Sequence, residues 1–293
     1  MVENKRVYIE NSHGEKLVGI LHETGSSELV VVCHGFRSTK DRIPMSNIAL
    51  AFEREGISAF RFDFAGNGES EGSFQYGNYR REAEDLRAVV EHFKANQRCI
   101  VAVVGHSKGG NVVLLYASKY NDVQTVINIA GRFDLRRGIE GRLGKDFREK
   151  IKQYGFIDVR NRRGSNVCLN HFLSYVVSRV GLGSCIYGRV VGKIEYQVTE
   201  ASLKDRLETD PRAACRSIPS NCSVLTVHGT LDEMVLVDDA TEFAKNIRNH
   251  DLCIVEGADH EFTEHQARLN DVVLRFVSTH LRKNEVARPT PRL

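Results

Sequence analysis

Short apolar runs alternate with longer amphipathic stretches along most of the chain, and this alternation predicts the fold. Runs rich in β-branched residues have the length of buried strands, at residues 29–33, 58–62, 100–104 and 125–129. Between them, apolar positions recur at helical spacing, most clearly across residues 83–93. Strands that alternate with helices form a mostly parallel sheet covered on both faces, so we expect an α/β fold.

The same pattern is present towards both ends of the chain. Residues 7–9 and 17–21 flank a turn-forming Asn-Ser-His-Gly and predict an opening hairpin. Further strand and helix pairs follow at residues 224–227 with 236–247, and at residues 252–255 with a helix through 272–277. We therefore expect a core made of residues 1–130 and 218–282.

Residues 131–217 interrupt the alternation and are too long for a loop, so we interpret them as an inserted cap. Within them, residues 165–191 carry only Arg179 and Arg189 as charges, with an abrupt change of composition on both sides. Two hypotheses remain open for that segment, namely a splice or gene-model insertion and a hydrophobic lid. Residues 283–293 contain two prolines and little apolar surface, which predicts a flexible tail.

Composition and charge narrow the class of protein. The 293 residues carry a net charge of +3, too small to indicate nucleic acid or a membrane surface as a partner. Residues 131–163 hold eleven Lys/Arg against five Asp/Glu, which most simply indicates a solvated basic face. The seven cysteines lack the Cys-x-x-Cys spacing that is typical of metal sites. No apolar run is long enough to span a membrane, and no apolar stretch of the kind found in a secretory signal follows the N-terminus. We expect a soluble, cytoplasmic protein.

The sequence GHSKG at residues 105–109 is the strongest candidate for chemistry. It fits G-x-S-x-G and lies where a predicted strand meets a predicted helix, the position of a nucleophile on a sharp turn. Gly105 and Gly109 would let the two chain segments pass each other, and the turn would project the hydroxyl of Ser107 above the sheet. Ser107 is therefore the predicted nucleophile.

A serine hydroxyl needs a base, and the base needs a group that orients it. His260 follows the strand at residues 252–255, at the carboxyl edge where α/β sheets bind ligands, and it is the predicted base in preference to His265. Asp232 follows the strand at residues 224–227 at the same edge and is the predicted orienting carboxylate.

Three other aspartates compete with Asp232 for this role. Asp238 and Asp239 are expected to begin a helix and to face solvent, and Asp259 adjoins His260 too closely to orient its ring. The chain order Ser107, Asp232, His260 is the order typical of α/β hydrolases.

An oxyanion formed on attack requires two backbone donors. The amide of Lys108, directly after the nucleophile, is one candidate. The second is the amide of Phe36, in the His-Gly-Phe loop after the strand at residues 29–33.

Two sequences resemble cofactor motifs without meeting their requirements. The histidines of HEFTEH at residues 260–265 are five apart, whereas a zinc helix places them four apart. GNGESEG at residues 66–72 lacks the lysine and glycine register of a phosphate loop. We expect no metal and no organic cofactor.

Five motifs in register now make the chain similar to a known family. They are HGF at 34–36, FDFAGNGES at 62–70, GHSKG at 105–109, HGTLD at 228–232 and GADH at 257–260. The chain resembles the α/β-hydrolase superfamily, in its serine aminopeptidase and monoacylglycerol-lipase-like branch, and especially cinnamoyl or feruloyl esterases and their plant relatives. The resemblance covers residues 5–130 and 200–282. It departs at Ala65 and Asn67, where the family usually has Arg and His.

The resemblance implies a serine hydrolase that cleaves carboxylic esters of small to medium size, with aromatic acyl esters among the candidates. The cap aromatics Phe133, Phe147, Tyr154 and Phe156 either line the acyl pocket or, more simply, pack the cap. Two alternatives stay open: an amide or thioester hydrolase with the same triad, and a non-enzymatic receptor for a small ligand. The expected partner is a small-molecule substrate, and the sequence does not indicate an oligomeric state.

Overall fold

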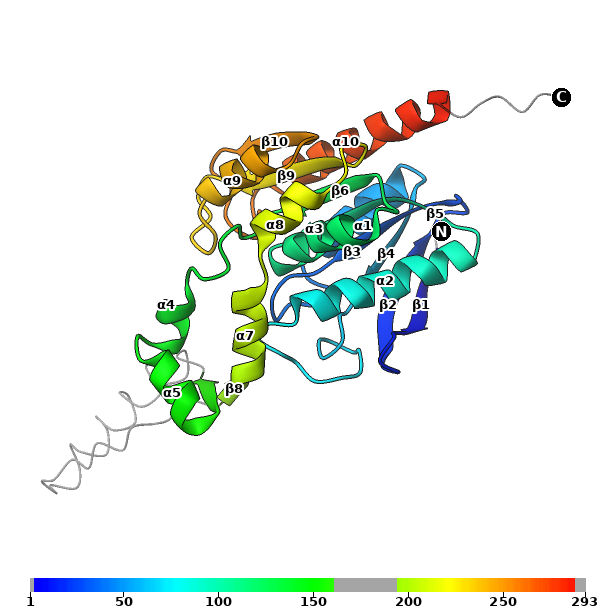
Figure 1. The fold of residues 1–293 in the computed structure, drawn as a ribbon. Coiled ribbons are helices and arrows are strands. Elements are labelled where there is room, and N and C mark those ends of the chain that lie inside the picture. The colour runs from blue at the N-terminus through cyan, green and yellow to red at the C-terminus, as the bar shows by residue number, and fades with distance from the viewer. Residues whose placement is uncertain (1–2, 161–193, 288–293) are drawn as a thin grey trace, which may run out of the picture. The chain divides into compact units, whose positions relative to one another are not determined.

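An eight-stranded sheet forms the centre of the computed structural model, which describes residues 3–160 and 194–287. The strand order is β1-β2-β4-β3-β5-β6-β9-β10 (Figure 1). The hairpin of β1 and β2 pairs antiparallel with the rest, and the other neighbours are parallel. The strand bounds are Glu3–Glu10 (β1), Lys16–Glu23 (β2), Glu28–Cys33 (β3), Ser58–Phe62 (β4), Cys99–His106 (β5), Thr125–Ile129 (β6), Ser223–Gly229 (β9) and His250–Val255 (β10).

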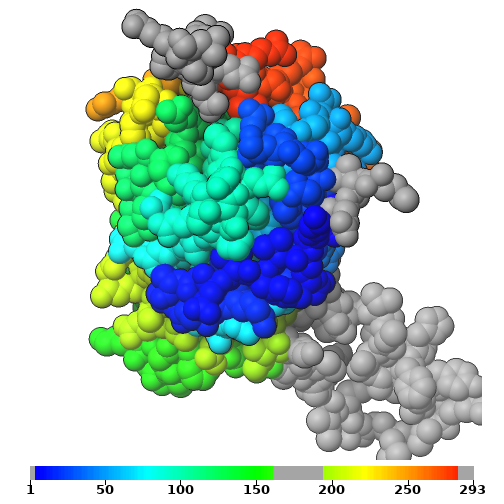
Figure 2. All heavy atoms as spheres, turned by 90° about the vertical axis from the view of Figure 1, so that its right-hand side faces the viewer, coloured from blue at the N-terminus to red at the C-terminus, as the bar shows by residue number. Residues whose placement is uncertain are grey.

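Helices cover both faces of this sheet, as the alternating pattern predicts. Helices α1 (Met45–Arg54) and α10 (Gln266–Ala287) pack on one face, and the other face carries α2 (Tyr79–Ala95), α3 (Lys108–Tyr120), α8 (Pro211–Ser217) and α9 (Asp238–Asn246). In the space-filling view, the surface of α2 lies beside that of β1 and β2 (Figure 2). Helix α10 extends to Ala287, so the first residues of the predicted tail are helical.

Two apolar clusters hold these layers together. The β-branched residues of β3 alternate between them: Val31 faces the helices α2 and α3, whereas Val30 and Val32 face α1 and α10. Strands buried on both faces show continuous apolar runs for this reason. The expected α/β fold with a mostly parallel sheet is confirmed.

The chain divides into two units. The larger comprises Met1–Phe74, Asn78–Leu135 and Asp205–Leu293, and the smaller comprises Gln75–Gly77 and Arg136–Lys204. The predicted cap boundaries at residues 131 and 217 stay predictions. The uncharged segment at residues 165–191 lies outside the described residues, as does the end of the predicted tail.

The smaller unit contains short elements. They are α4 (Ile139–Leu143), α5 (Phe147–Tyr154), the first part of α7 (Glu200–Glu208), and an antiparallel pair formed by β7 (Phe156–Arg160) and β8 (Ile194–Thr199). Phe147 and Ile151 are buried, and Tyr76 stacks on Tyr196 with ring centroids 6.4 Å apart.

The four aromatic residues predicted to belong to the cap have different environments. Phe147 packs inside the smaller unit, whereas Tyr154 and Phe156 are exposed. Phe133 lies in the larger unit and packs edge-on against Phe243. Across residues 3–160 and 194–287, no helix has the length and apolar content that crossing a membrane requires.

Candidate active site

Ser107 lies on a sharp turn between β5 and α3. Its backbone has φ +55° and ψ −117°, a region that non-glycine residues rarely occupy, and it stands at the N-cap position of α3 without a capping hydrogen bond from its side chain. The amide of Ser107 donates to the carbonyl oxygen of Ile129 on β6 at 2.7 Å. The strained residue is thus fixed by the sheet, as expected for a predicted nucleophile.

Gly105 and Gly109 make the close approach that the motif predicts. A Cβ atom on Gly105 would lie 2.1 Å from the carbonyl oxygen of Gly109, and one on Gly109 would lie 2.5 Å from that of His34. Both contacts are with backbone, which cannot move aside as a flexible side chain can. Any larger residue at either position would therefore force the turn apart.

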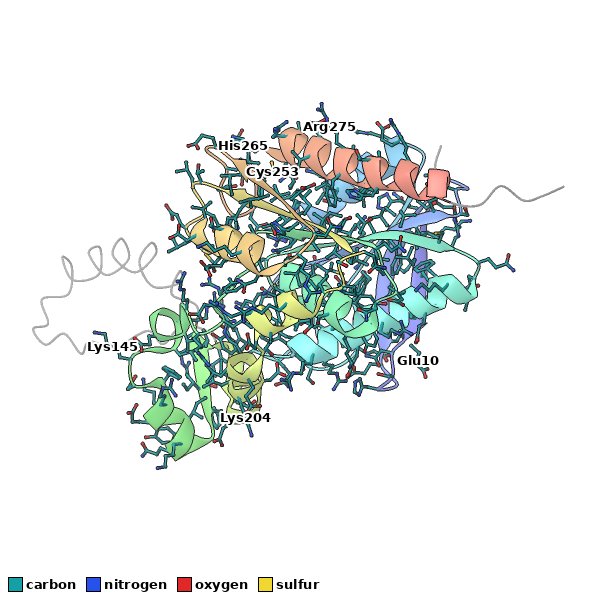
Figure 3. The ribbon with its side chains drawn as sticks, turned by 45° about the horizontal axis from the view of Figure 1, so that its top comes forward. Glu10, Lys145, Lys204, Cys253, His265 and Arg275 are labelled. Carbon is teal, nitrogen blue, oxygen red and sulfur yellow. The ribbon has the colours of Figure 1, made fainter. Side chains whose placement is uncertain are left out.

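The structure brings Ser107, His260 and Asp232 together from three loops at the carboxyl edge of the sheet. Ser107 Oγ lies 3.0 Å from His260 Nε2, and His260 Nδ1 lies 2.7 Å from Asp232 Oδ2. His265, the competing base, lies directly before α10 (Figure 3), where its ring is near Gly257. The geometry therefore favours His260 as the partner of Ser107.

Asp232 is buried and accepts several hydrogen bonds. Its Oδ1 accepts from the amides of Met234 and Val235 at 2.8 and 2.7 Å. Its Oδ2 lies 3.2 Å from His228 Nε2, which also donates to the carbonyl oxygen of Val235. Burial alone would raise the pKa of Asp232, but the hydrogen bonds from His228 and His260 hold that pKa well below its ordinary value. The carboxylate is therefore charged at neutral pH and can orient the imidazole of His260.

The competing aspartates have other partners. Asp238 begins α9 and is exposed, as predicted. The expectation that Asp239 faces solvent is wrong, because Asp239 is buried and accepts from the amide of Phe133 at 3.2 Å. Asp259 accepts from both the amide and the hydroxyl of Thr263, so it caps the loop that carries His260.

His106 is buried beside Ser107, and no sequence pattern indicates a role for it. Its Nε2 donates to the carbonyl oxygen of His260 at 2.9 Å, and the two rings lie 4.9 Å apart. Burial lowers the pKa of His106 to about 3, so its ring stays neutral at physiological pH. His106 thus ties the turn of Ser107 to the loop of His260. Its partner is 154 residues away, so local sequence gives no signal for this contact.

The His-Gly-Phe loop lies against Ser107. A Cβ atom on Gly35 would lie 3.0 Å from Cβ of Ser107, so only glycine fits there without a shift. His34 Nδ1 donates to the carbonyl oxygen of Gly35 at 2.8 Å, and its Nε2 accepts from the amide of Phe64 at 3.1 Å. Burial lowers the pKa of His34 to about 4, which keeps it in this neutral tautomer. The loop that carries the Phe36 amide is therefore fixed beside Ser107.

The loop after β4 supports this edge of the sheet through a buried ion pair. Asp63 accepts from the amide of Lys40 at 2.7 Å and from its ammonium group at 2.8 Å. A Cβ atom on Gly68 would lie 2.2 Å from the Asp63 carboxylate, so the loop closes around that group. Ala65 and Asn67 depart from the family pattern. The amide of Ala65 donates to Asp85 Oδ2 on α2 at 2.9 Å, and Asn67 Nδ2 donates to the carbonyl oxygen of Ala65 at 3.2 Å.

Three described residues have the spacing to hold a metal ion. His106, His260 and Glu261 offer ligand atoms within 4.8 Å of one another. Both ring nitrogens of His260 already bond to Ser107 and Asp232, and His106 donates to a carbonyl. A bound metal would have to displace these contacts, so the donor set fits a resident metal poorly. The expectation of no metal stays a prediction.

The sequence is similar to those of known proteins, one of them a lipase. Residues 25–165 match the family model described as serine aminopeptidase, S33. A monoacylglycerol lipase of Mycolicibacterium smegmatis is 24 % identical over an alignment of 272 residues that covers 88 % of this chain and 91 % of that protein. The uncharacterized protein YDL057W of Saccharomyces cerevisiae is 25 % identical over an alignment of 255 residues that covers 80 % of this chain and 69 % of that protein.

Solved structures show the same fold. Est1E from Butyrivibrio proteoclasticus, in a structure with bound ferulic acid, superimposes with a TM-score of 0.73 at 20 % identity, covering 94 % of this chain and 99 % of that one. The α/β hydrolase GrgF from Penicillium sp. sh18 gives a TM-score of 0.72 at 22 % identity, covering 95 % and 99 %. The chain therefore has the α/β-hydrolase fold, and over residues 25–165 its sequence resembles the serine aminopeptidase, S33, family.

Proposed function

We propose that this protein is a serine hydrolase that cleaves carboxylic esters of small to medium size through an acyl-enzyme on Ser107. The observation that carries the proposal is the continuous chain of hydrogen bonds from Ser107 Oγ through His260 to Asp232, at 3.0 and 2.7 Å. A hydroxyl, an imidazole and a buried carboxylate in this order are the groups that acyl transfer requires.

In the first half of the reaction, His260 Nε2 takes the proton of Ser107 while Oγ attacks the ester carbonyl. The C–O bond to the alcohol then breaks, and the alcohol leaves with the proton from His260. In the second half, His260 takes a proton from water, whose oxygen attacks the acyl-enzyme. The bond between the acyl carbon and Ser107 Oγ then breaks, His260 returns the proton to Oγ, and the acid is released. Asp232 stays ionised and stabilises the charged imidazolium in both halves.

The oxyanion of each tetrahedral intermediate is assigned to the amides of Phe36 and Lys108. Lys108 is the first residue of α3, and the first amides of a helix have no carbonyl partner within it. Phe36 follows Gly35, whose close approach to Ser107 sets the distance between the loop and the reacting carbon. Two donors on rigid loops suit a charge that develops only in the transition state.

Labelling with a fluorophosphonate probe tests the proposal, with the Ser107→Ala variant as its comparison. We expect the wild type to be labelled and the variant not to be. The wild type should also turn over p-nitrophenyl acetate steadily, and Ser107→Ala should lower kcat by about 10⁴-fold or more. Equal labelling of both proteins would show that Ser107 is not the nucleophile.

The same assay distinguishes the alternatives. A single turnover without steady release would favour a ligand receptor with a retained triad. Faster cleavage of matched amides or thioesters than of esters would favour those substrates. Because the related Est1E structure holds ferulic acid, feruloyl and acetyl esters form an informative substrate pair.

A further inference from the structure

Lys108 carries the only side chain among the first three residues of α3, because Gly109 and Gly110 follow it. A larger residue at either glycine would force a neighbouring group to shift. A Cβ atom on Gly109 would lie 2.6 Å from the carbonyl oxygen of Cys33, and one on Gly110 would lie 2.2 Å from Asn128 Oδ1. Within these three residues, side-chain contacts that hold the start of α3 must therefore come from Lys108.

The side chain of Lys108 is buried beside α2. Its Nζ donates to Glu82 Oε1 at 2.5 Å and lies 5.1 Å from the centroid of the Tyr79 ring. Both Lys108 and Glu82 side chains are 4 % exposed. Burying an ammonium group costs several kcal/mol unless it is paired, and the positive end of a helix dipole disfavours a cation. The fold keeps Lys108 in this place despite both costs.

The partners of Lys108 are themselves fixed. The amide of Tyr79 donates to Asp205 Oδ2 at 3.1 Å, and its hydroxyl accepts from Arg206 at 3.0 Å. Arg206 Nε donates to the carbonyl oxygen of Leu135 at 2.9 Å. The first turn of α2 is therefore a rigid support for the Lys108 side chain.

We propose that the Lys108 side chain is a positioning residue for the reaction, a role that rests on the proposed function. It clamps the start of α3 to α2 and so fixes the direction of the Lys108 amide, the assigned oxyanion donor. The adjoining Ser107 has a strained backbone that relaxes unless its surroundings hold it. An oxyanion donor acts only when it lies about 2.7–3.1 Å from the developing charge, so a small rotation of this peptide weakens it.

Steady-state kinetics of Lys108→Met with p-nitrophenyl acetate at pH 8 tests the proposal. We expect kcat to fall about 10- to 100-fold, less than the loss of a whole oxyanion donor, with KM within about twofold of the wild type. Lys119→Met is the matched control, because Lys119 lies on the same helix and pairs with Glu84 of α2 at 3.4 Å on the exposed surface. That variant should keep the wild-type kcat.

A second variant separates positioning from stability. Lys108→Met leaves the buried Glu82 carboxylate without its cation, so the melting temperature of this variant should be lower than that of the wild type. The double variant Lys108→Met/Glu82→Gln removes both charges and should recover much of that melting temperature, yet kcat should stay low. If kcat recovers together with the melting temperature, or if Lys108→Met alone stays within threefold of the wild type, the inference is overturned.

Turnover and labelling of the wild type distinguish a failure of the proposed function from a failure of this inference. A wild type with neither turnover nor fluorophosphonate labelling would overturn the proposed function, and this inference with it. A wild type that is labelled and turns over leaves the variants as a test of Lys108 alone.

Discussion

The two units of the chain differ in how their strands are buried. In the larger unit, all five residues of β6 are buried, and β3 has five buried residues of six. In the smaller unit, β7 has no buried residue and β8 has one. A two-stranded sheet with so little apolar cover is marginal by itself, whereas the eight-stranded sheet has helices on both faces. The larger unit is thus suited to hold reacting groups in place, and it contains every proposed triad residue.

Replacing Asp232, the buried carboxylate of the proposed triad in the larger unit, should have the largest effect on activity. Asp232→Asn keeps an acceptor for the amides of Met234 and Val235 but presents an NH₂ group to His260 Nδ1, which forces the wrong tautomer. We expect kcat for p-nitrophenyl acetate to fall by about 10⁴-fold. Asp146→Asn, on the exposed surface of the smaller unit, should stay within about twofold. Similar losses in both variants would contradict the division of roles between the units.

A pair of glycine substitutions sharpens the comparison further. In Gly105→Ala, the added methyl group would lie 2.1 Å from backbone, so we expect the free energy of unfolding to fall by about 3 kcal/mol or more. In Gly141→Ala, on α4 of the smaller unit, the methyl group meets nothing within 4 Å, and the variant should gain up to about 1 kcal/mol. Urea unfolding measures both. A tolerated Gly105→Ala would show that the turn is not packed as described.

Glu82 gives a smaller effect that depends on pH. Burial raises the pKa of Glu82 to about 7, against the lowering effect of Lys108, and Asp85 and Asp205 add to the rise. A carboxyl group with a raised pKa in the folded state contributes stability that is full below its unfolded value of about 4.5 and is lost as pH rises through about 7.

The Glu82→Gln variant leaves Lys108 without its carboxylate at every pH, but it has no carboxyl group to ionise. The free energy of unfolding of the variant relative to that of the wild type should therefore rise as pH goes from about 4.5 to 7 and stay constant above that. This rise should be on the order of 1–3 kcal/mol in urea unfolding. Glu84→Gln, at a more exposed position of α2, is the control and should show little dependence on pH. A relative stability of the variant that falls as pH rises would mean that Lys108, and not burial, dominates the pKa of Glu82.

The sequence predicted the larger unit well because its signals are local. The β-branched runs in β3 and β6 are buried on both faces, so their apolar character is continuous and easy to recognise. Ser107, Asp232 and His260 each follow a predicted strand, and the carboxyl ends of parallel strands share one edge of a sheet. Position after a strand was therefore enough to bring the three together.

The features that the sequence did not predict depend on distant partners or on weak patterns. The bonds of His106 to the His260 carbonyl and of Lys108 to Glu82 join residues 154 and 26 positions apart. The burial of Asp239 likewise depends on the Phe133 amide, 106 positions away. No strand was predicted at β7 or β8, because half-exposed strands lack both an apolar run and a strict alternation.

The hydrogen bond from Arg206 to the carbonyl oxygen of Leu135 affects how freely the segment between these residues can change in length. Leu135 directly precedes the segment Arg136–Lys204 and Arg206 follows it by two positions, so this bond, with Nε and the carbonyl oxygen 2.9 Å apart, links the chain before the segment to the chain after it. The entropy of closing a loop grows only slowly with its length, by about 0.6 kcal/mol for each doubling. With its ends joined at one buried arginine, the excursion can be lengthened or shortened at little cost to the sheet, and the arginine is the residue that such changes must preserve.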